Sequence, residues 1–242
     1  ARLREARDGA HLLATFCRTS VPRFAAWVKS RTLGEFVSAS PELLVEREGR
    51  NVRVEPMKGT AAPDQRAWLE ASEKDRAELA MITDLLRDDL HHLCERGSVV
   101  VENDRRFIEL PYVLQTVADV SGVLREDVTT RALLSQVHPG GSVTGAPRNA
   151  ACAIIGKLEQ TPRGAYCGLL GLEREVREEE EAPSPSGRGL GVREHTLITS
   201  LLIRTAERVP TGWLYGVGGG ITWDSDAKSE LAEVQLKLGA LR

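Results

Sequence analysis

The 242-residue chain has few cysteines, few aromatic residues and no long apolar segment. Its four cysteines are widely separated and form no Cys-x-x-Cys pair, which argues against a zinc site or a disulfide framework. No apolar run approaches the roughly 20 residues that a membrane-spanning helix requires. The polar N-terminal residues lack the apolar centre of a secretory signal. We therefore expect a cytoplasmic protein with no membrane partner.

Strong net charge is also lacking. A formal net charge of -3 and a pI near 6.0 provide no broad basic field for phosphate backbones, so nucleic acid is not an expected partner. A hydrophobic content of 41% can build the core of one large domain or two small ones. Predicted strands and helices do not alternate regularly, which favours a mixed α/β fold with antiparallel sheets over a parallel sheet.

The local patterns predict the secondary structure in outline. We expect short helices at 2–13 and 22–29, a hairpin formed by 43–47 and 51–55, and a long helix at 64–96. Further strands are expected at 98–101, 107–110, 113–120, 166–173, 196–206 and 213–217. Helices are expected at 125–137, from the end of a glycine-rich loop to about 160, and from about 224 to 241.

The most distinctive short segment is Pro56-Met57-Lys58-Gly59-Thr60, which follows a predicted strand. Lysine is usually a solvated surface charge, so the segment alone does not separate a surface residue from a functional one. A glycine-rich stretch at 140–147 opens a predicted helix, where backbone N–H groups and the helix dipole favour an anion. Most such loops are only turns, so this signal is weak by itself.

Two acidic pairs recur with a spacing of three residues, Asp75 with Glu78 and Glu230 with Glu233. Residues three apart on a helix project from nearly the same side. The first pair lies in line with an apolar stripe, where a carboxylate needs a cation partner, although a solvated first turn is the alternative. Glu233 and Lys237 can equally form a surface pair. The recurrence favours a shared divalent cation, and magnesium prefers such carboxylates together with water and substrate oxygens.

Arg204 lies within the predicted strand at 196–206, on the face shared by Ser200 and Leu202. Such an arginine either extends its charged end to the surface or pairs with a carboxylate, and both alternatives stay open. Downstream, the triple glycine at 218–220 permits close approach by backbone or ligand.

Seven motifs together resemble the chorismate-utilising enzymes, in the order found in that family and from about residue 36 onwards. The family includes anthranilate synthase component I, aminodeoxychorismate synthase component I, and isochorismate and salicylate synthases. Within it, the chain most resembles the aminodeoxychorismate synthase component I branch, because Lys58 stands where the other branches typically carry alanine. The motifs are Ser40-Pro41-Glu42, Pro56 to Thr60, Lys74 to Glu78, residues 140–147, Tyr166-Cys167-Gly168, Ile203-Arg204-Thr205, and Gly218 to Ile221 with Asp224-Ser225 and Glu230-x-x-Glu233.

The resemblance implies a layered fold of mostly antiparallel sheets flanked by helices, and a chemical role for Lys58. Its amine would attack C2 of chorismate while the C4 hydroxyl leaves, with Glu42 as general acid/base. Ammonia from a glutamine amidotransferase subunit would then add at C4 and expel the lysine. The implied product is 4-amino-4-deoxychorismate, a precursor of 4-aminobenzoate and folate.

The resemblance also implies a ligand set. Glu78 and Glu233 match direct magnesium ligands, and Asp75 and Glu230 match supporting acids, with the metal bridging to the ring carboxylate. The residues expected at the substrate are Thr60, Gly141, Ser142, Thr144, Tyr166, Arg204, Gly219 and Gly220.

Several features depart from the family pattern. Gln115 stands where a histidine is usual and cannot relay protons near neutral pH, and Arg148 replaces a common lysine while keeping the charge. The charged, Pro- and Ser-rich segment 174–194 predicts a disordered loop within a single catalytic domain at 1–242. Because family chains usually begin well before this one, we expect an N-terminally truncated chain of compromised stability.

Two alternative functions stay open. The first is another chorismate enzyme, either an anthranilate synthase or an isochorismate or salicylate synthase. The second is a degenerate subunit that binds chorismate, or only its partner, without turnover, which the short length and Gln115 favour.

Overall fold

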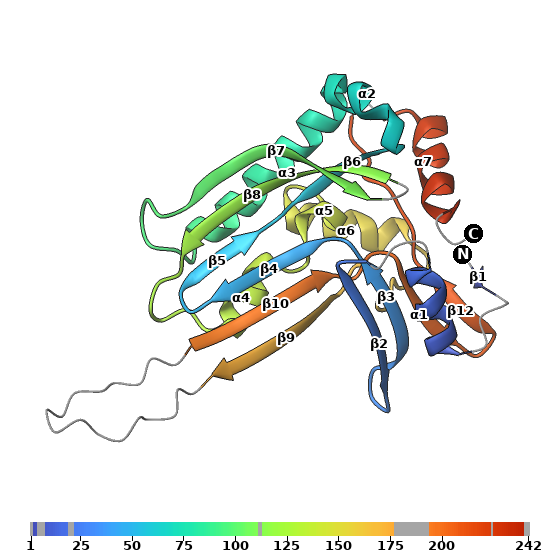
Figure 1. Ribbon diagram of the computed structural model, residues 1–242, viewed down its shortest axis with the longest axis horizontal. Coiled ribbons are helices and arrows are strands. Elements are labelled where there is room, and N and C mark those ends of the chain that lie inside the picture. Colours follow the sequence, from blue (N-terminus) through green and yellow to red (C-terminus); the bar gives the residue numbers. More distant parts are fainter. Residues whose placement is uncertain are drawn as a thin grey trace, which may run out of the picture.

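The computed structural model describes residues 2–3, 8–18, 22–110, 113–176, 194–223 and 225–239. Figure 1 shows strands gathered into two sheets, with helices packed against them. The helices are α1 (Gly9–Cys17), α2 (Arg66–Ala71), α3 (Glu73–His91), α4 (Thr130–Val137), α5 (Gly141–Thr144), α6 (Arg148–Leu158) and α7 (Ala227–Gly239), with a 3-10 turn η1 (Pro63–Gln65) before α2. The strands are β1 (Arg2–Leu3), β2 (Phe24–Ser30), β3 (Gly34–Ser40), β4 (Leu43–Glu48), β5 (Asn51–Val54), β6 (Met57–Ala61), β7 (Val100–Leu110), β8 (Val113–Val123), β9 (Leu169–Val176), β10 (Glu194–Leu201), β11 (Thr205–Val209) and β12 (Gly212–Tyr215).

All strand pairings among the described residues are antiparallel. The smaller sheet has the order β1-β12-β11-β3-β2, and the larger sheet has the order β6-β8-β5-β4-β10-β9. The long strand β8 pairs with β7 along one edge and with β5 and β6 along the other. The predicted mixed α/β fold, with antiparallel sheets flanked by helices, is confirmed.

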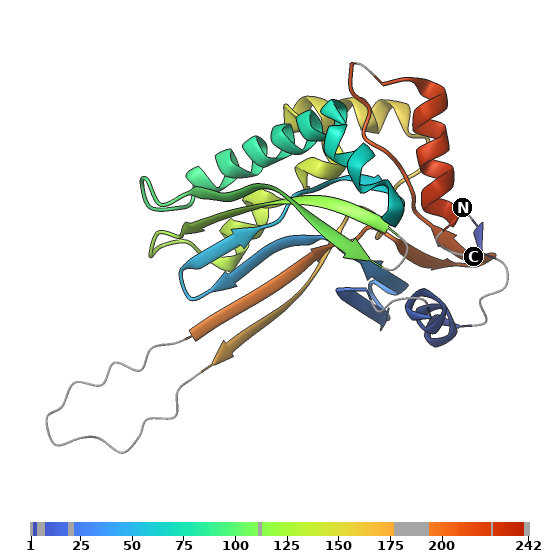
Figure 2. The same ribbon diagram turned by 45° about the horizontal axis from the view of Figure 1, so that its top comes forward.

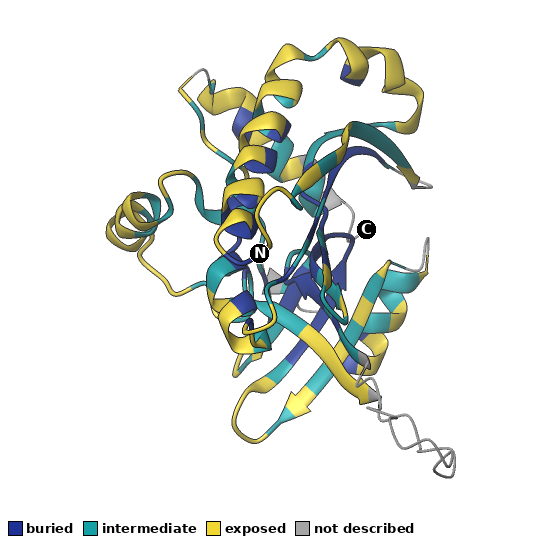
Figure 3. Cartoon of the chain, turned by 90° about the vertical axis from the view of Figure 1, so that its left-hand side faces the viewer, coloured by how far each residue is buried: buried dark blue, intermediate teal, exposed yellow. Residues whose placement is uncertain are grey.

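The main core lies between the larger sheet and the helices α3 and α4. These helices and α5 and α6 gather on the same side of that sheet (Figures 1 and 2). Figure 3 shows buried residues along the strands and exposed residues on the outer helix faces. Burying this much apolar surface is the main source of stability. The fully buried members include Val45, Val54, Ile82, Leu90, Val120, Leu133 and Leu201.

Three of the predicted helices differ clearly from the structure. The helix expected at 2–13 begins only at Gly9 and ends at Cys17, and residues 2–3 form the short strand β1. The segment at 22–29 is the edge strand β2, not a helix, because its residues pair with β3 from Phe24↔Ser40 to Ser30↔Gly34. A short apolar run cannot by itself separate a buried strand from a helix. The long helix at 64–96 is divided at Ser72, whose hydroxyl caps α3 by accepting from Asp75 N.

The strand predicted at 196–206 is interrupted, because the chain passes from one sheet to the other within it. β10 belongs to the larger sheet and β11 to the smaller one. Arg204 lies at this crossing with a φ of 51°, so the strand alternation that predicted its face is wrong. Its carbonyl accepts a hydrogen bond of 3.1 Å from Ala39 N.

The predicted loop at 174–194 falls mostly outside the described residues. Its ends, residues 174–176 and 194, belong to β9 and β10. Asp224 is likewise outside the described residues. In the part of the chain that the structure describes, no helix is both long and apolar enough to cross a membrane.

Candidate active site

The candidate site lies where the chain crosses between the two sheets. Besides the β10–β11 crossing, residues 41–42 carry the chain from β3 to β4. The two crossings are joined directly, because Leu201 N donates to Glu42 O at 3.2 Å and Ser40 Oγ donates to Leu201 O at 2.6 Å. A third segment joins them through Cys167 N, which donates to Leu202 O at 2.9 Å. Three of the seven sequence motifs therefore meet at the junction of the sheets.

Glu42 is buried at this junction, with 6% of its surface exposed. Ser142 Oγ donates to Glu42 Oε1 at 2.8 Å. Burial raises the pKa of the Glu42 carboxyl to about 7, while the Ser142 hydrogen bond and the charges of Lys58 and Lys237 act in the opposite direction. A carboxyl with this pKa can both give and take a proton near neutral pH.

Lys58 is positioned by a bulge in β6. Its carbonyl accepts a hydrogen bond from Thr116 Oγ1, and Gly59, with a φ of 75°, is the extra residue between Lys58 and Thr60. The ammonium lies 3.8 Å from Glu78 Oε2, and the side chain is 16% exposed. A Cβ atom at Gly220 would lie 2.8 Å from Lys58 Nζ, so this glycine leaves the space that the amine occupies.

One acid of each pair, Glu78 of α3 and Glu230 of α7, contacts Lys74. Lys74 Nζ lies 2.7 Å from Glu230 Oε1 and 3.8 Å from Glu78 Oε1. Glu233, by contrast, pairs with Lys237 at 2.7 Å. The structure therefore places Glu230, rather than Glu233, opposite Glu78. Asp75 accepts a hydrogen bond from Ser72 Oγ at the start of α3.

The residues around Glu230 fit a magnesium ion. Within the described ranges, no three His, Cys, Asp or Glu side chains converge closely enough to hold a metal by themselves. Magnesium usually takes one or two carboxylates and completes its shell with water and substrate oxygens. Glu230 Oε2 is buried and has no hydrogen-bond partner among the described residues. A Cβ atom at Gly219 would lie 3.3 Å from this oxygen, so the glycine keeps the space beside it open.

The remaining predicted contacts frame the same region. The Tyr166 ring lies over the glycine loop, since a Cβ atom at Gly218 would lie 3.1 Å from its hydroxyl oxygen. Burial raises the pKa of Tyr166 above its ordinary value, which keeps the phenol a hydrogen-bond donor. Gly141 packs against Leu85 of α3, and Thr144 Oγ1 donates to Gly140 O at 2.9 Å.

The helix predicted after the glycine-rich loop is confirmed as α6, which begins directly after Pro147. The loop itself contains the four-residue helix α5, which was not predicted and is followed by Gly145 with a φ of 126°. The loop is connected to the site by the Ser142 hydroxyl, which donates to Glu42.

Gln115 lies opposite Thr60 in the strand pairing and is buried, with its Oε1 atom unpartnered among the described residues. Arg148 lies on α6, where it binds buried Asp89.

Sequence reasoning missed two lysines of this site. No pattern in the sequence indicates a role for Lys74, and the helical spacing offers Lys237 only as a surface partner of Glu233. Lys237 Nζ donates to Gly218 O at 3.0 Å, and its charge opposes the raised pKa of Glu42. The signal for both was their proximity in sequence to the acidic pairs, but helical spacing does not tell which way a long side chain turns.

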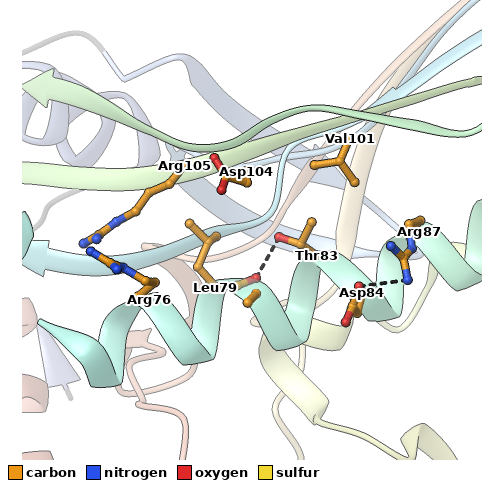
Figure 4. Close-up of a pocket in the computed structure, with 9 residues that line it drawn as sticks. Arg76, Leu79, Thr83, Asp84, Arg87, Val101, Asp104 and Arg105 are labelled. Carbon is orange, nitrogen blue, oxygen red and sulfur yellow. Dashed lines mark hydrogen bonds and ion pairs between the residues drawn. The ribbon is translucent and has the colours of Figure 1, made fainter.

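A separate cavity of about 470 Å³ lies between α3 and β7, and none of the predicted site residues lines it. Figure 4 shows Arg76 and Arg105 side by side at one end of it. Both donate to Glu70 O at the end of α2, at 3.2 and 3.1 Å. Cations at a helix C-terminus satisfy its unpaired carbonyls. These arginines therefore hold α2 in place.

The chorismate binding enzyme family matches residues 2–177 and 189–242, so the chain belongs to that family. The fold agrees with that of anthranilate synthase component I from Streptococcus pneumoniae, with a TM-score of 0.77 and 24% identity over 97% of this chain and 50% of that one.

Curated relatives carry two different names. Anthranilate synthase component 1 of Haloarcula marismortui is 35% identical over 86% of this chain. Aminodeoxychorismate synthase of Streptomyces griseus is 36% identical over 93% of this chain. The chain spans 40% and 30% of the lengths of these two relatives.

Proposed function

We propose that this chain belongs to an enzyme that converts chorismate and ammonia into 4-amino-4-deoxychorismate and water. The observation that carries the proposal is the position of Lys58. Its amine is largely shielded from solvent beside Glu78 and the backbone of Gly220, in the same site as Glu42. A lysine held in this way is suited to a covalent step rather than to surface solvation.

The chemistry follows from two allylic displacements. The unprotonated Lys58 amine forms a bond to C2 of chorismate, both ring double bonds shift, and the C4 hydroxyl leaves as water with a proton from Glu42. Ammonia then forms a bond to C4, both double bonds shift back, the C2–N bond to Lys58 breaks, and the incoming nitrogen returns a proton to Glu42. Glu42 suits the acid role because burial keeps a large share of its carboxyl protonated near pH 7.

The substrate carboxylates would be held by the groups around the glycine loop. We assign this role to Arg204, to the Tyr166 hydroxyl and to the backbone near Gly219 and Gly220, with Ser142, Gly141, Thr144 and Thr60 shaping the walls. Glu78 and Glu230 would hold magnesium, with Asp75 and Glu233 in support. When bound, the metal would neutralise the ring carboxylate and fix its orientation.

We further propose that a glutamine amidotransferase subunit supplies the ammonia. Releasing ammonia from glutamine requires a reactive thiolate. Burial raises the pKa of Cys94 and of Cys167, so these two of the four thiols are poorly suited to that role, which supports a separate source of ammonia.

Product analysis tests the proposed reaction. The protein, incubated with chorismate, magnesium and an ammonium salt, should form 4-amino-4-deoxychorismate, identified by chromatography and mass spectrometry. Anthranilate or isochorismate as the main product would replace the proposal with one of the alternative synthase activities. Chorismate binding without turnover, measured by calorimetry, would instead show a non-catalytic subunit.

A further inference from the structure

One cation of the candidate site has no role in the proposed reaction. Lys74 begins the first turn of α3, and its ammonium contacts Glu230 of α7 at 2.7 Å and Glu78 of its own helix at 3.8 Å. The two carboxylate side chains are 7% and 13% exposed, whereas that of Lys74 is 42% exposed. A partly solvated ammonium thus bridges one buried acid, Glu230, and one largely shielded acid, Glu78.

The bridge neutralises a charge that would otherwise be costly. Two buried carboxylates without a counter-charge repel each other and lose their hydration. Burial opposes ionisation of Glu230, but hydrogen bonds from Lys74 and Ser225 hold its pKa below the ordinary value. The second oxygen, Glu230 Oε2, is left without a partner among the described residues. Lys74 therefore partners only one of the two Glu230 oxygens, and the other oxygen is left for a divalent cation.

We propose that the ammonium group of Lys74 competes with magnesium for the carboxylates of Glu230 and Glu78. The inference rests on the magnesium site of the proposed function. Both cations bind the same two carboxylates, and two positive charges held close together repel each other, so metal binding drives the ammonium away. The half-exposed side chain can turn into solvent at little cost. Lys74 thereby prevents repulsion between the acids when no metal is bound and weakens the affinity for the metal.

Calorimetric titration of the protein with MgCl₂, without chorismate, tests this competition. Removing the ammonium in Lys74→Met should tighten magnesium binding by about 5- to 10-fold, the size expected for one partly exposed ion pair. Lys74→Arg, which keeps the charge, should stay within about two-fold of the wild type. Lys157→Met removes the same charge from an exposed position of α6 and is the matched control for net charge.

A thermal unfolding series supplies a second readout. Without metal, Lys74→Met should melt at a lower temperature than the wild type, and saturating magnesium should remove this difference, because a ligand that binds the folded state stabilises it. Unchanged or weaker magnesium binding in Lys74→Met would overturn the competition. Undiminished binding in Glu230→Gln would overturn it too, by placing the metal elsewhere. An unexpected reaction product together with tighter binding in Lys74→Met would refute the proposed reaction and leave the competition standing.

Discussion

Two groups of charged side chains each contain buried acids, and they differ in how completely the polar atoms of those acids are paired. The first, called here the arginine cluster, consists of Arg23, Arg53, Arg106, Glu55 and Asp119. Glu55, which is 2% exposed, binds all three guanidinium groups, two of them at 2.6 and 3.4 Å. Arg106 also binds both oxygens of Asp119, at 2.6 and 2.8 Å. Each of these buried carboxylate oxygens therefore has a cationic partner.

The second group, the lysine cluster, consists of Lys58, Lys74, Glu42, Glu78 and Glu230, and its pairing is incomplete. Glu230 has one unpartnered oxygen, Lys58 lies 3.8 Å from Glu78, and burial raises the pKa of Glu42 to about 7. Closed ion networks fix a structure, whereas groups with unfilled bonding capacity can bind ligands or transfer protons. This contrast is the reason why we propose the lysine cluster, and not the arginine cluster, as the reactive one.

Replacing Lys58 should produce the largest effect on activity. We expect Lys58→Ala to lower 4-amination by roughly 10³-fold or more, because no other group would form the bond to C2. Initial rates of product formation measure this loss. Intact-protein mass spectrometry should also show that the variant lacks any chorismate-derived adduct. Lys157→Ala is the control, and an equal adduct in Lys58→Ala would refute the nucleophile.

Replacing Glu55 should instead affect stability. Glu55→Ala leaves three arginines without their shared partner, and we expect unfolding to become easier by about 2–4 kcal/mol, since the arginines are only partly buried. Urea denaturation measures the change. Glu46→Ala, which removes a single ion pair to Arg53, should cost about 1 kcal/mol or less. Equal costs for the two variants would show that the arginine cluster is no network.

Glu42→Gln tests the cost of the raised pKa. Folding raises the pKa of Glu42 from 4.5 to about 7, so the folded state holds the proton more tightly than the unfolded chain. The stability that the folded state gains by holding this proton is fully present below about pH 4.5 and is lost as the pH rises through about 7. Glutamine stays neutral, so between pH 5 and pH 8 the variant should gain about 1–3 kcal/mol relative to the wild type. If the free energies of unfolding of the wild type and the variant changed in parallel with pH over that range, the raised pKa would be contradicted.

Gly220→Ala should have the smallest effect of the four. The added methyl group meets the flexible end of Lys58, so the fold should lose less than about 1 kcal/mol while the rate of 4-amination falls about 10-fold. Gly156→Ala on α6 meets no atom within 4 Å and should leave the rate unchanged while stabilising the helix slightly. An unaltered rate in Gly220→Ala would show that the amine does not work in the position seen here.

Much of the fold was predictable from local patterns. The β4–β5 hairpin, the amphipathic α3 and the antiparallel class all follow from periodicity and turn residues, because these act over a few positions. The edge strand β2 was not predictable, since its short apolar run is explained only by its pairing with β3. The left-handed backbone at Arg204 was also hidden, because nothing local shows that the chain changes sheets there.

By itself the sequence determined which chemical groups are present: an amine, a glutamate and two acidic pairs among ordered family motifs. Only the tertiary structure decided which of them meet. It set Glu230 opposite Glu78 and placed Lys74 between them, and it decided that Glu233 takes the Lys237 partner that helical spacing had offered as one alternative. The physical reason is that charge partners separated by 150 residues are chosen by how sheets and helices pack, and helical spacing carries no information about that packing.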